Sequence, residues 1–322
     1  MIQSKNHRNF GWGKNIEFAG KHALMFAADE SGGRFGWLAA NKFRWSKFCR
    51  YAEPLGITDA RLVNAAVIEG YAATISGLSV AVQQNYISAI NVTLRHLSGG
   101  SWKPVSPKQI VGLSRYTVRT TPILFTEECV RSASEDLRKS GHIRLSYVPL
   151  LCYFLGLRRR EAALLYIEMS LQEARICGAV DVRRGTKGGR GASVQRLVPT
   201  NAVIEGILSN IVGVIDSRDH CLIPKSFSYK QFNSEISNTV LPVLKRYGVN
   251  KLHDLRVAYA CQRYSEITGY DAPCNQMSKT RVPAVIDEPA RQTISNELGH
   301  GRGQIVSAYI GVNPPHRGGD SG

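Results

Sequence analysis

The sequence predicts a mainly α-helical protein with a small β-sheet, built from two domains at residues 1–120 and 121–322. Its 322 residues are enough for two domains of about 150 residues, each with its own core. Apolar side chains recur at helical spacing along most of the chain. One short β-type run precedes a glycine-rich turn and another follows it, which is typical of a hairpin. We therefore expect a helical N-terminal domain followed by an α+β C-terminal domain.

Composition narrows the class of protein. Hydrophobic residues make up 43% of the chain and charged residues 20%, which fits a folded chain rather than a disordered one. No apolar run approaches the roughly 18–20 residues of a membrane span, and the N-terminus has no apolar signal region. The seven cysteines are scattered without a CxxC pair, so we expect no disulfide framework and no zinc site. These features favour a cytoplasmic protein with no membrane partner.

Net charge points to the kind of partner. The chain has 41 Lys+Arg against 25 Asp+Glu, a formal charge of +16. Such an excess indicates an anionic partner, most often nucleic acid. Charge alone also fits a basic protein without such a partner, so only sequence motifs can indicate whether the partner is nucleic acid.

The N-terminal region, about 14–100, has helical patterns at 37–52, 59–75 and 79–97. Asp59 and Ser79 are candidate N-caps, and glycines at 77, 99 and 100 are candidate stops. The last helix is rich in amides and hydroxyls, which suits a phosphate or base surface but equally an ordinary polar face. Residues 100–125 combine prolines with basic side chains and read as an interdomain linker.

The C-terminal region alternates helical and β-type segments. Thr126, followed by two glutamates, is a candidate helix cap. Strands are expected at 176–184 and 193–198 around GTKGGRGA, as a β-hairpin. Residues 268–290 contain three prolines and are expected to form a loop or a partner surface. Helices are expected at 126–140, 146–169, 201–215, 228–247, 254–267 and 290–309.

Three short motifs carry chemistry. In GLRRRE, three consecutive arginines beside an apolar run cannot all be buried unpaired, so one could be held by the fold and aimed at an anion. In HDLR, His253 and Arg256 share a helix face and could both donate to one phosphate. LGH ends at His300, and Tyr309 follows nine residues later. Each motif alone also fits a basic turn or an ordinary core residue.

Together and in this order, the motifs resemble the tyrosine recombinase (phage integrase) family. The matching residues are Arg158, His253, Arg256, His300 and Tyr309. The resemblance is specific over 126–310 and weak over 1–120. It implies a helical core-binding domain at 1–120 and a catalytic recombinase domain at 121–322.

These side chains fit phosphoryl transfer on their own chemistry, independently of the family resemblance. Two guanidiniums, from Arg158 and Arg256, can neutralise a phosphodiester and stabilise its pentacoordinate transition state. His300 can donate a further hydrogen bond. Tyr309 is the expected nucleophile, and His253 is the expected acceptor of its proton. The arginines supply the charge, so we expect no metal and no cofactor.

The resemblance adds a sixth catalytic residue and a reaction. Lys187, the only lysine between 140 and 224, matches the hairpin lysine of the family, which implies protonation of the leaving 5′ oxygen. The implied intermediate is a 3′-phosphotyrosine, rejoined without ATP. Four protomers would hold two DNA duplexes and exchange strands through a Holliday junction, with accessory DNA-bending proteins at the nucleoid as further partners.

Several alternatives stay open. The first hypothesis is an integrase that inserts or excises a phage or mobile element. A recombinase that resolves chromosome dimers and a non-catalytic DNA-binding relative are the others. Within the site, Arg159 could replace Arg158 if the helix starts one residue later, and Tyr264 or Tyr270 could replace Tyr309. Glu161 is expected to orient an arginine rather than act as an acid.

Overall fold

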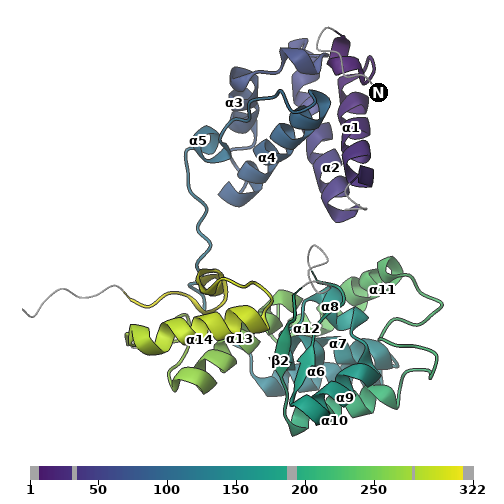
Figure 1. Cartoon of the computed structure of the whole chain (residues 1–322), viewed down its shortest axis with the longest axis vertical. Coiled ribbons are helices and arrows are strands. Elements are labelled where there is room, and N and C mark those ends of the chain that lie inside the picture. Colours follow the sequence, from purple (N-terminus) through teal and green to yellow (C-terminus); the bar gives the residue numbers. More distant parts are fainter. Residues whose placement is uncertain (1–6, 31–34, 187–193, 278–279, 315–322) are drawn as a thin grey trace, which may run out of the picture. The chain divides into compact units, whose positions relative to one another are not determined.

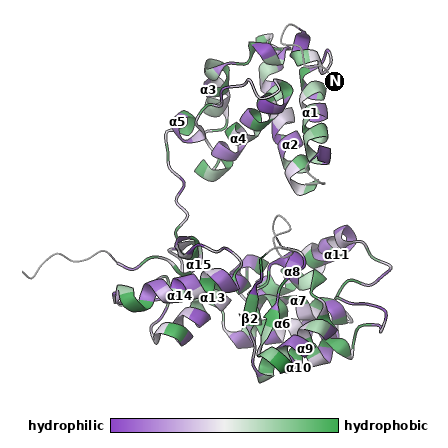
Figure 2. Ribbon diagram, viewed as in Figure 1, coloured by the Kyte–Doolittle hydropathy of each residue, from purple (hydrophilic) through white to green (hydrophobic). Residues whose placement is uncertain are grey.

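The computed structural model describes residues 7–30, 35–186, 194–277 and 280–314 (Figure 1). It divides into two compact units, Met1–Tyr116 and Thr117–Gly322, each with its own hydrophobic core. The chain is mostly helical with one two-stranded sheet in the described ranges, which is the fold class that the sequence predicts. The long helices carry both hydrophobic and hydrophilic residues (Figure 2), as amphipathic helices do.

The N-terminal unit packs its helices around aromatic residues of α2. Trp45 and Phe48 are fully buried, and Trp45 donates from Nε1 to the carbonyl of Ile16 at 3.2 Å. Gly20 permits this packing, because a Cβ there would lie 2.1 Å from Trp45 Nε1. The helices are α1 (Ile16–Glu30), α2 (Phe35–Ala52), α3 (Ala65–Thr74), α4 (Val80–Leu97) and α5 (Pro107–Val111).

Two predicted helices match α2 and α4 closely, but the prediction for 59–75 is wrong at its start. Asp59 caps a 3₁₀ turn at Ala60–Leu62, where its carboxylate accepts from the Arg61 amide. The helix α3 begins only after Asn64, whose side chain accepts from the Val67 amide. Two capping residues five positions apart thus divide the segment into two short helices.

The amide-rich face of α4 is buried rather than offered to a ligand. Asn91 donates to the carbonyl of Val105 at 2.7 Å and accepts from Trp102 Nε1 at 3.0 Å. Gln84 donates to the carbonyl of Leu113 at 2.6 Å. The amides therefore hold the following segment against α4, which corrects the phosphate-surface hypothesis for them. Most of the predicted linker at 100–125 belongs to the N-terminal unit.

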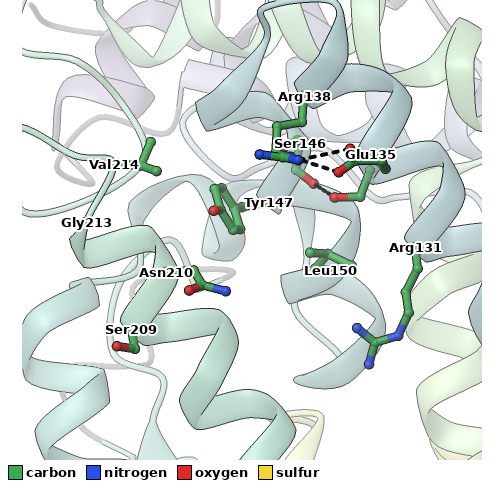
Figure 3. Close-up of a pocket in the computed structure, with 11 residues that line it drawn as sticks. Arg131, Glu135, Arg138, Ser146, Tyr147, Leu150, Ser209, Asn210, Gly213 and Val214 are labelled. Atoms are coloured by element: carbon green, nitrogen blue, oxygen red, sulfur yellow. Dashed lines mark hydrogen bonds and ion pairs between the residues drawn. The ribbon is translucent and has the colours of Figure 1, made fainter.

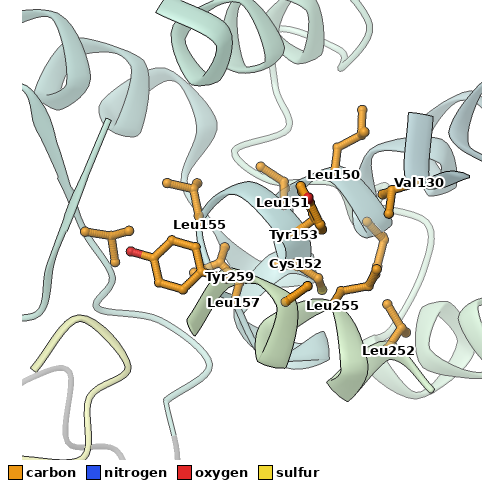
Figure 4. Packing of buried hydrophobic residues seen from close by; sticks show 14 of the residues in the cluster. Val130, Leu150, Leu151, Cys152, Tyr153, Leu155, Leu157, Leu252, Leu255 and Tyr259 are labelled. Atoms are coloured by element: carbon orange, nitrogen blue, oxygen red, sulfur yellow. The ribbon is translucent and has the colours of Figure 1, made fainter. Parts of the chain in front are cut away.

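The C-terminal unit has a helical core centred on α7 and α13 (Figure 4). Leu151, Cys152 and Leu155 pack with Leu255 and Tyr259 of α13, all of them buried. The helices of this unit are α6 (Glu127–Lys139), α7 (Ile143–Phe154), α8 (Arg159–Leu164), α9 (Ile167–Cys177), α10 (Ala202–Val212), α11 (Tyr229–Glu235), a π-helical stretch (Ile236–Val240), α12 (Leu241–Arg246), α13 (Leu252–Thr268), α14 (Ala284–Glu297) and α15 (Ser307–Ile310), the last preceded by a 3₁₀ turn (Gly303–Val306).

The predicted hairpin strands pair, but they are shorter than predicted. β1 (Ala179–Asp181) and β2 (Leu197–Pro199) are antiparallel, with Ala179 opposite Pro199. The helix α9 continues to Cys177 and ends at Gly178, so the prediction of a strand from 176 is wrong there. The single helix predicted at 146–169 is divided into α7, α8 and the start of α9. Gly156, at φ +58°, follows the end of α7.

The segment 268–290 is not all loop. The helix α14 begins at Ala284, directly after Pro283, and Asp287 anchors its first turn by accepting from Arg291 and from the Tyr264 hydroxyl. Pro289 lies inside the helix on its exposed side, where water can satisfy the carbonyl that it leaves unpaired. None of the helices in the described part of the chain is long and apolar enough to cross a membrane.

Candidate active site

Arg158 stands at the turn between α7 and α8. The turn depends on Gly156, because a Cβ there would lie 2.5 Å from the Tyr259 ring. Arg158 caps α8, and its backbone amide donates to Glu161 Oε2 at 2.7 Å while its Nη1 donates to Oε1 at 2.6 Å. Its side chain is 25% exposed. The turn therefore holds a guanidinium on a buried carboxylate and leaves part of it open to solvent.

Arg256 lies on the first turns of α13, three residues after His253. Its side chain is fully buried. Nη1 donates to the carbonyl of Gly156 and Nη2 to the carbonyl of Leu298. Arg256 thereby connects the turn before Arg158 with the loop after α14.

His300 and Tyr309 come from the C-terminal end of the unit. Gly299, at φ +67°, ends α14 and turns the chain, and the His300 amide donates to the carbonyl of Ser295 at 2.8 Å. The His300 Nε2 lies 2.8 Å from the Tyr309 hydroxyl. The same nitrogen lies 3.4 Å from Arg158 Nη2 and 3.5 Å from Arg256 Nη2. One imidazole nitrogen therefore joins the tyrosine to both arginines.

The Tyr309 ring is enclosed by cationic and aromatic neighbours. It is 5% exposed, with the Arg256 guanidinium carbon 5.7 Å from its centroid. The His253 ring lies 5.3 Å from it, centroid to centroid, and the His253 side chain is exposed. The structure thus brings Arg158, His253, Arg256, His300 and Tyr309 together, although they span 152 positions of the chain.

The excess of positive charge shifts the pKa values of the site. Burial, followed by the charges of Arg256 and Arg158, lowers the pKa of His300 to about 4. Partial burial and then Arg256 also lower the pKa of His253. Burial and the neighbouring arginines lower the pKa of Arg256 to about 10. At pH 7 the His300 ring is neutral, so its Nε2 can accept the hydrogen bond that the Tyr309 hydroxyl donates.

One buried carboxylate lies among three arginines. Glu161 is fully buried, and Arg158 holds its Oε1. Its Oε2 lies 2.8 Å from Arg196 Nη1 and 3.5 Å from Arg256 Nη1. Burial alone would raise the pKa of Glu161, but Arg196, Arg256 and Arg158 hold it below its usual value. With Glu161 ionised, the cluster keeps a surplus of two positive charges beside Tyr309.

Sequence reasoning missed Arg196. Its signal lay in the predicted strand at 193–198, where strand alternation puts Arg196 on the same face as Val198. Val198 is fully buried and Arg196 is 3% exposed. A charged residue in phase with a buried valine was evidence of an internal ion pair.

The alternative residues considered from the sequence have other contacts. Arg159 donates to Ser237 at 2.8 Å, and Arg160 lies over the Tyr229 ring at 5.3 Å. The Tyr264 hydroxyl is buried and donates to Asp287. Tyr270 is 37% exposed in the segment after α13. Arg158 and Tyr309 are therefore the ones that join the cluster.

The sequence also predicted Lys187 as a catalytic residue and no metal ion in the site. Lys187 lies outside the described residues, so the structure gives no position for it. Within the described ranges, no group of three or more His, Cys, Asp or Glu side chains could hold a metal ion.

A separate hollow of about 620 Å³ lies in the same unit, between α6, α7 and α10 (Figure 3). Its lining includes Arg131, Tyr147 and Asn210, and Arg138 donates to Glu135 at its edge at 2.8 Å. None of the residues around Tyr309 lines it. The hollow is therefore not part of the candidate active site.

The chain is similar to one known protein family and to a solved structure. Residues 112–262 match the family model described as Integrase, a range that includes Arg158, His253 and Arg256. This match covers slightly less than half of the chain, and it supports the resemblance to the tyrosine recombinase (integrase) family. The crystal structure of XerA recombinase is similar at a TM-score of 0.39 and 15% identity, covering 91% of this chain and 94% of that chain. No curated protein matches the sequence.

Proposed function

We propose that this protein is a site-specific DNA recombinase that cleaves and rejoins DNA strands with Tyr309 as the nucleophile. The observation that carries the proposal is the hydrogen bond of 2.8 Å between the Tyr309 hydroxyl and His300 Nε2, with Arg158 and Arg256 within 3.5 Å of the same nitrogen. A potential nucleophile, a neutral base and two fixed cations therefore share one small volume, as phosphoryl transfer requires.

The arginines would bind the phosphodiester. Arg158 is partly exposed, whereas Arg256 is buried beneath the Tyr309 ring. We propose that the phosphate first contacts Arg158 and then Arg256 as the Tyr309 ring moves off it. Both guanidiniums would stabilise the charge that builds up on the non-bridging oxygens when the Tyr309 oxygen attacks and the bond to the 5′ oxygen breaks.

Proton transfer would involve both histidines. The sequence assigned the Tyr309 proton to His253 and phosphate binding to His300. The hydrogen bond favours His300 as the first acceptor, because the lowered pKa of His300 keeps its Nε2 unprotonated at neutral pH. His253, whose ring lies against the tyrosine with an exposed side, would then donate to the phosphate. The proton on the leaving 5′ oxygen would come from Lys187, a role that only the family resemblance supports.

The product of cleavage would be a 3′-phosphotyrosine bond at Tyr309 and a free 5′ hydroxyl. Because that bond conserves the energy of the phosphodiester, a second DNA end could attack it without ATP. The helical residues 1–120 would grip the core DNA site while residues 121–322 carry out catalysis. Four protomers would hold two duplexes, aided by DNA-bending proteins.

The biological setting we propose is integration or excision of a phage or other mobile element at the nucleoid. Resolution of chromosome dimers uses the same chemistry. A non-catalytic DNA-binding relative is disfavoured, because such a protein has no need for a tyrosine hydrogen-bonded inside a cationic cluster that is costly to bury.

Covalent trapping tests the proposal. The full-length protein is incubated in EDTA with nicked DNA of a candidate attachment site and run on a denaturing gel beside Tyr309→Phe. Tyr270→Phe, a tyrosine of the same unit outside the cluster, is the matched control. We expect an adduct with wild type and Tyr270→Phe and none with Tyr309→Phe. An adduct that persists in Tyr309→Phe would contradict the proposal.

Salt dependence tests the DNA partner itself. With six to ten phosphate contacts, affinity for duplex DNA should fall by about 10³- to 10⁵-fold between 50 and 200 mM salt. Fluorescence anisotropy on a labelled duplex measures it. A flat response would exclude an extended basic contact with DNA.

A further inference from the structure

Arg196 is a buried arginine that contacts three separate parts of the candidate active site. It lies directly before β2 and is 3% exposed. Its Nη1 lies 2.8 Å from Glu161 Oε2, its Nε donates to the carbonyl of Glu297 at 2.6 Å, and its Nη2 donates to the carbonyl of Gly156 at 3.5 Å. A side chain so enclosed cannot contact DNA, so its influence must act through these partners.

The partners of Arg196 are the supports of the catalytic side chains. Gly156 lies two residues before Arg158, and Glu297 lies three residues before His300. Arg256 joins the same two loops: it donates to the same Gly156 carbonyl and to the carbonyl of Leu298, next to Glu297. Two guanidiniums therefore fasten the Arg158 turn to the His300 loop. The loop is closely fitted to Arg196, because a Cβ on Gly299 would lie 3.0 Å from the Arg196 Cδ.

Arg196 also takes up the charge of Glu161. Of the three arginines around this carboxylate, Arg196 is nearest to Oε2, while Arg256 is 3.5 Å away. Without Arg196, the buried carboxylate would be left with Arg158 and Arg256 alone. A buried charge that loses a partner is costly, so Glu161 would then compete with the phosphate for Arg158 and Arg256.

We propose that Arg196 is a positioning residue for DNA cleavage: it fixes the Arg158 turn to the His300 loop and occupies Glu161, so that Arg158 and Arg256 stay available to the scissile phosphate. This inference rests on the proposed recombinase function. Arg196 acts on cleavage rather than on DNA affinity, because it is buried away from the surface.

The first test separates cleavage from binding. Arg196→Met, Arg196→Lys and the matched control Arg183→Met are compared, since Arg183 is 46% exposed and precedes the same predicted turn. With saturating nicked DNA, single-turnover cleavage should fall about 100-fold in Arg196→Met, and less in Arg196→Lys, which keeps the charge. Affinity should stay within about threefold. Cleavage by Arg196→Met within threefold of wild type would overturn the inference.

Two further measurements keep the inference testable if Arg196→Met is unstable. The double variant Arg196→Met with Glu161→Gln removes the opposing charges together, and its cleavage rate should exceed that of Arg196→Met alone. The His300 titration followed by NMR needs no activity: the loss of the Arg196 charge should raise the pKa of His300 above its value of about 4. A wild type that forms no adduct would defeat the proposed function, whereas an unmoved His300 titration would defeat the positioning role.

An independent observation concerns two thiols behind the tyrosine. Cys261 Sγ and Cys274 Sγ lie 3.7 Å apart, at 3.9 and 3.7 Å from the backbone carbonyl oxygen of Tyr309. Cys261 is buried on α13, and Cys274 is half-buried in the segment that follows. The Cys274 amide donates to the carbonyl of Ile310 at 2.8 Å. The pair therefore supports the short helix α15 that carries Tyr309.

We further propose that peroxide converts this pair to a disulfide that switches the tyrosine off. The Cys274 thiolate would attack the peroxide and become a sulfenic acid, and the Cys261 sulfur would then displace hydroxide from it. The two thiols lose two electrons and two protons, and one hydrogen peroxide becomes two waters. The hydrogen bond from Cys261 and the Arg119 charge favour this order, since they lower the pKa of Cys274 although burial opposes them. Shortening the distance between the two sulfur atoms from 3.7 Å to about 2.05 Å would shift the segment of Cys274, whose amide donates to the Ile310 carbonyl, and would thereby displace α15.

Peroxide treatment of the full-length protein tests the switch. Mass spectrometry after differential alkylation maps the disulfide, and the trapping gel reports adduct yield. We expect a Cys261–Cys274 bond, an adduct yield reduced at least tenfold and recovery with dithiothreitol. Cys274→Ser should resist peroxide, whereas the exposed-cysteine control Cys177→Ser should not. A mapped disulfide without loss of adduct, or no such disulfide, would overturn the switch. Wild type that forms no adduct before peroxide would instead defeat the proposed function.

Discussion

The two units differ in the polar side chains that they bury. In the N-terminal unit the described buried polar side chains are neutral except for Asp59, and the amides of Asn91 and Gln84 each donate to a backbone carbonyl. In the C-terminal unit many of them are charged, with Arg196 and Arg256 beside Glu161. The Nε of Arg256 has no hydrogen-bond partner in the described part of the chain.

The buried amides and the buried arginines differ in what their burial indicates. A buried amide with satisfied partners stabilises one arrangement of the chain and needs no ligand to explain it. A buried surplus of positive charge costs stability, so its retention indicates a site that needs an anion. The comparison predicts that disruption of the amides changes folding, whereas disruption of the arginines changes chemistry.

The largest effect should follow Arg256→Met. Loss of this guanidinium removes stabilisation of the transition state, so single-turnover cleavage should fall by about 10²- to 10³-fold or more. Gel-based cleavage at saturating DNA measures it. Arg246→Met, an arginine 65% exposed on α12, is the control and should cleave like wild type. Equal cleavage rates for Arg256→Met and Arg246→Met would show that Arg256 does not contribute to cleavage.

Asn91→Leu should lower the stability of the N-terminal unit. It removes bonds to the Val105 carbonyl and to Trp102 Nε1 and leaves buried groups unpaired, at a cost of about 3 kcal/mol. All four tryptophans lie in this unit, so tryptophan fluorescence during urea unfolding reports its stability. Asn85→Leu, which loses only an exposed contact with Arg115, should change stability by less than about 0.5 kcal/mol. An unchanged unfolding midpoint in Asn91→Leu would show that the amide does not hold the segment.

The smallest effect is a pH dependence of the C-terminal unit. An unfolded histidine binds its proton near pH 6.5, whereas folded His300 does so near pH 4. The unfolded state therefore binds more protons in this window, and the free energy of unfolding falls as pH decreases from 6.5 to 4. The His300 contribution is on the order of 2 kcal/mol. Urea unfolding followed by circular dichroism should show a smaller loss in His300→Gln, and identical losses would contradict the lowered pKa.

Much of the fold could be predicted from the sequence because its signals are local. Thr126 with its glutamates predicted the start of α6, and helical spacing predicted α2, α4 and α10. The failures arose where distant residues decide. Asp287 stabilises the start of α14 by pairing with Arg291 and Tyr264, which no periodicity near Pro283 could indicate. Asn64 and Asp59 are both good caps, and only packing decides where α3 begins.

The site followed a similar division. Motif order predicted five side chains that the structure brings together: Arg158, His253, Arg256, His300 and Tyr309. It was not enough to assign contacts between them: the Tyr309 hydroxyl meets His300 rather than His253. Arg196 was missed because its partner Glu161 lies 35 positions away, across a turn that the strand pattern does not reveal.

The most direct test of the central claim is to find which side chain carries the DNA. After trapping on nicked DNA, nuclease and trypsin digestion should leave a nucleotide on one peptide, which mass spectrometry identifies. Trypsin releases residues 303–317, a segment with a single tyrosine. A nucleotide on this peptide, fragmented to Tyr309, is the predicted result. A nucleotide on residues 264–279, the tryptic peptide that contains both Tyr264 and Tyr270, would contradict Tyr309 as the nucleophile.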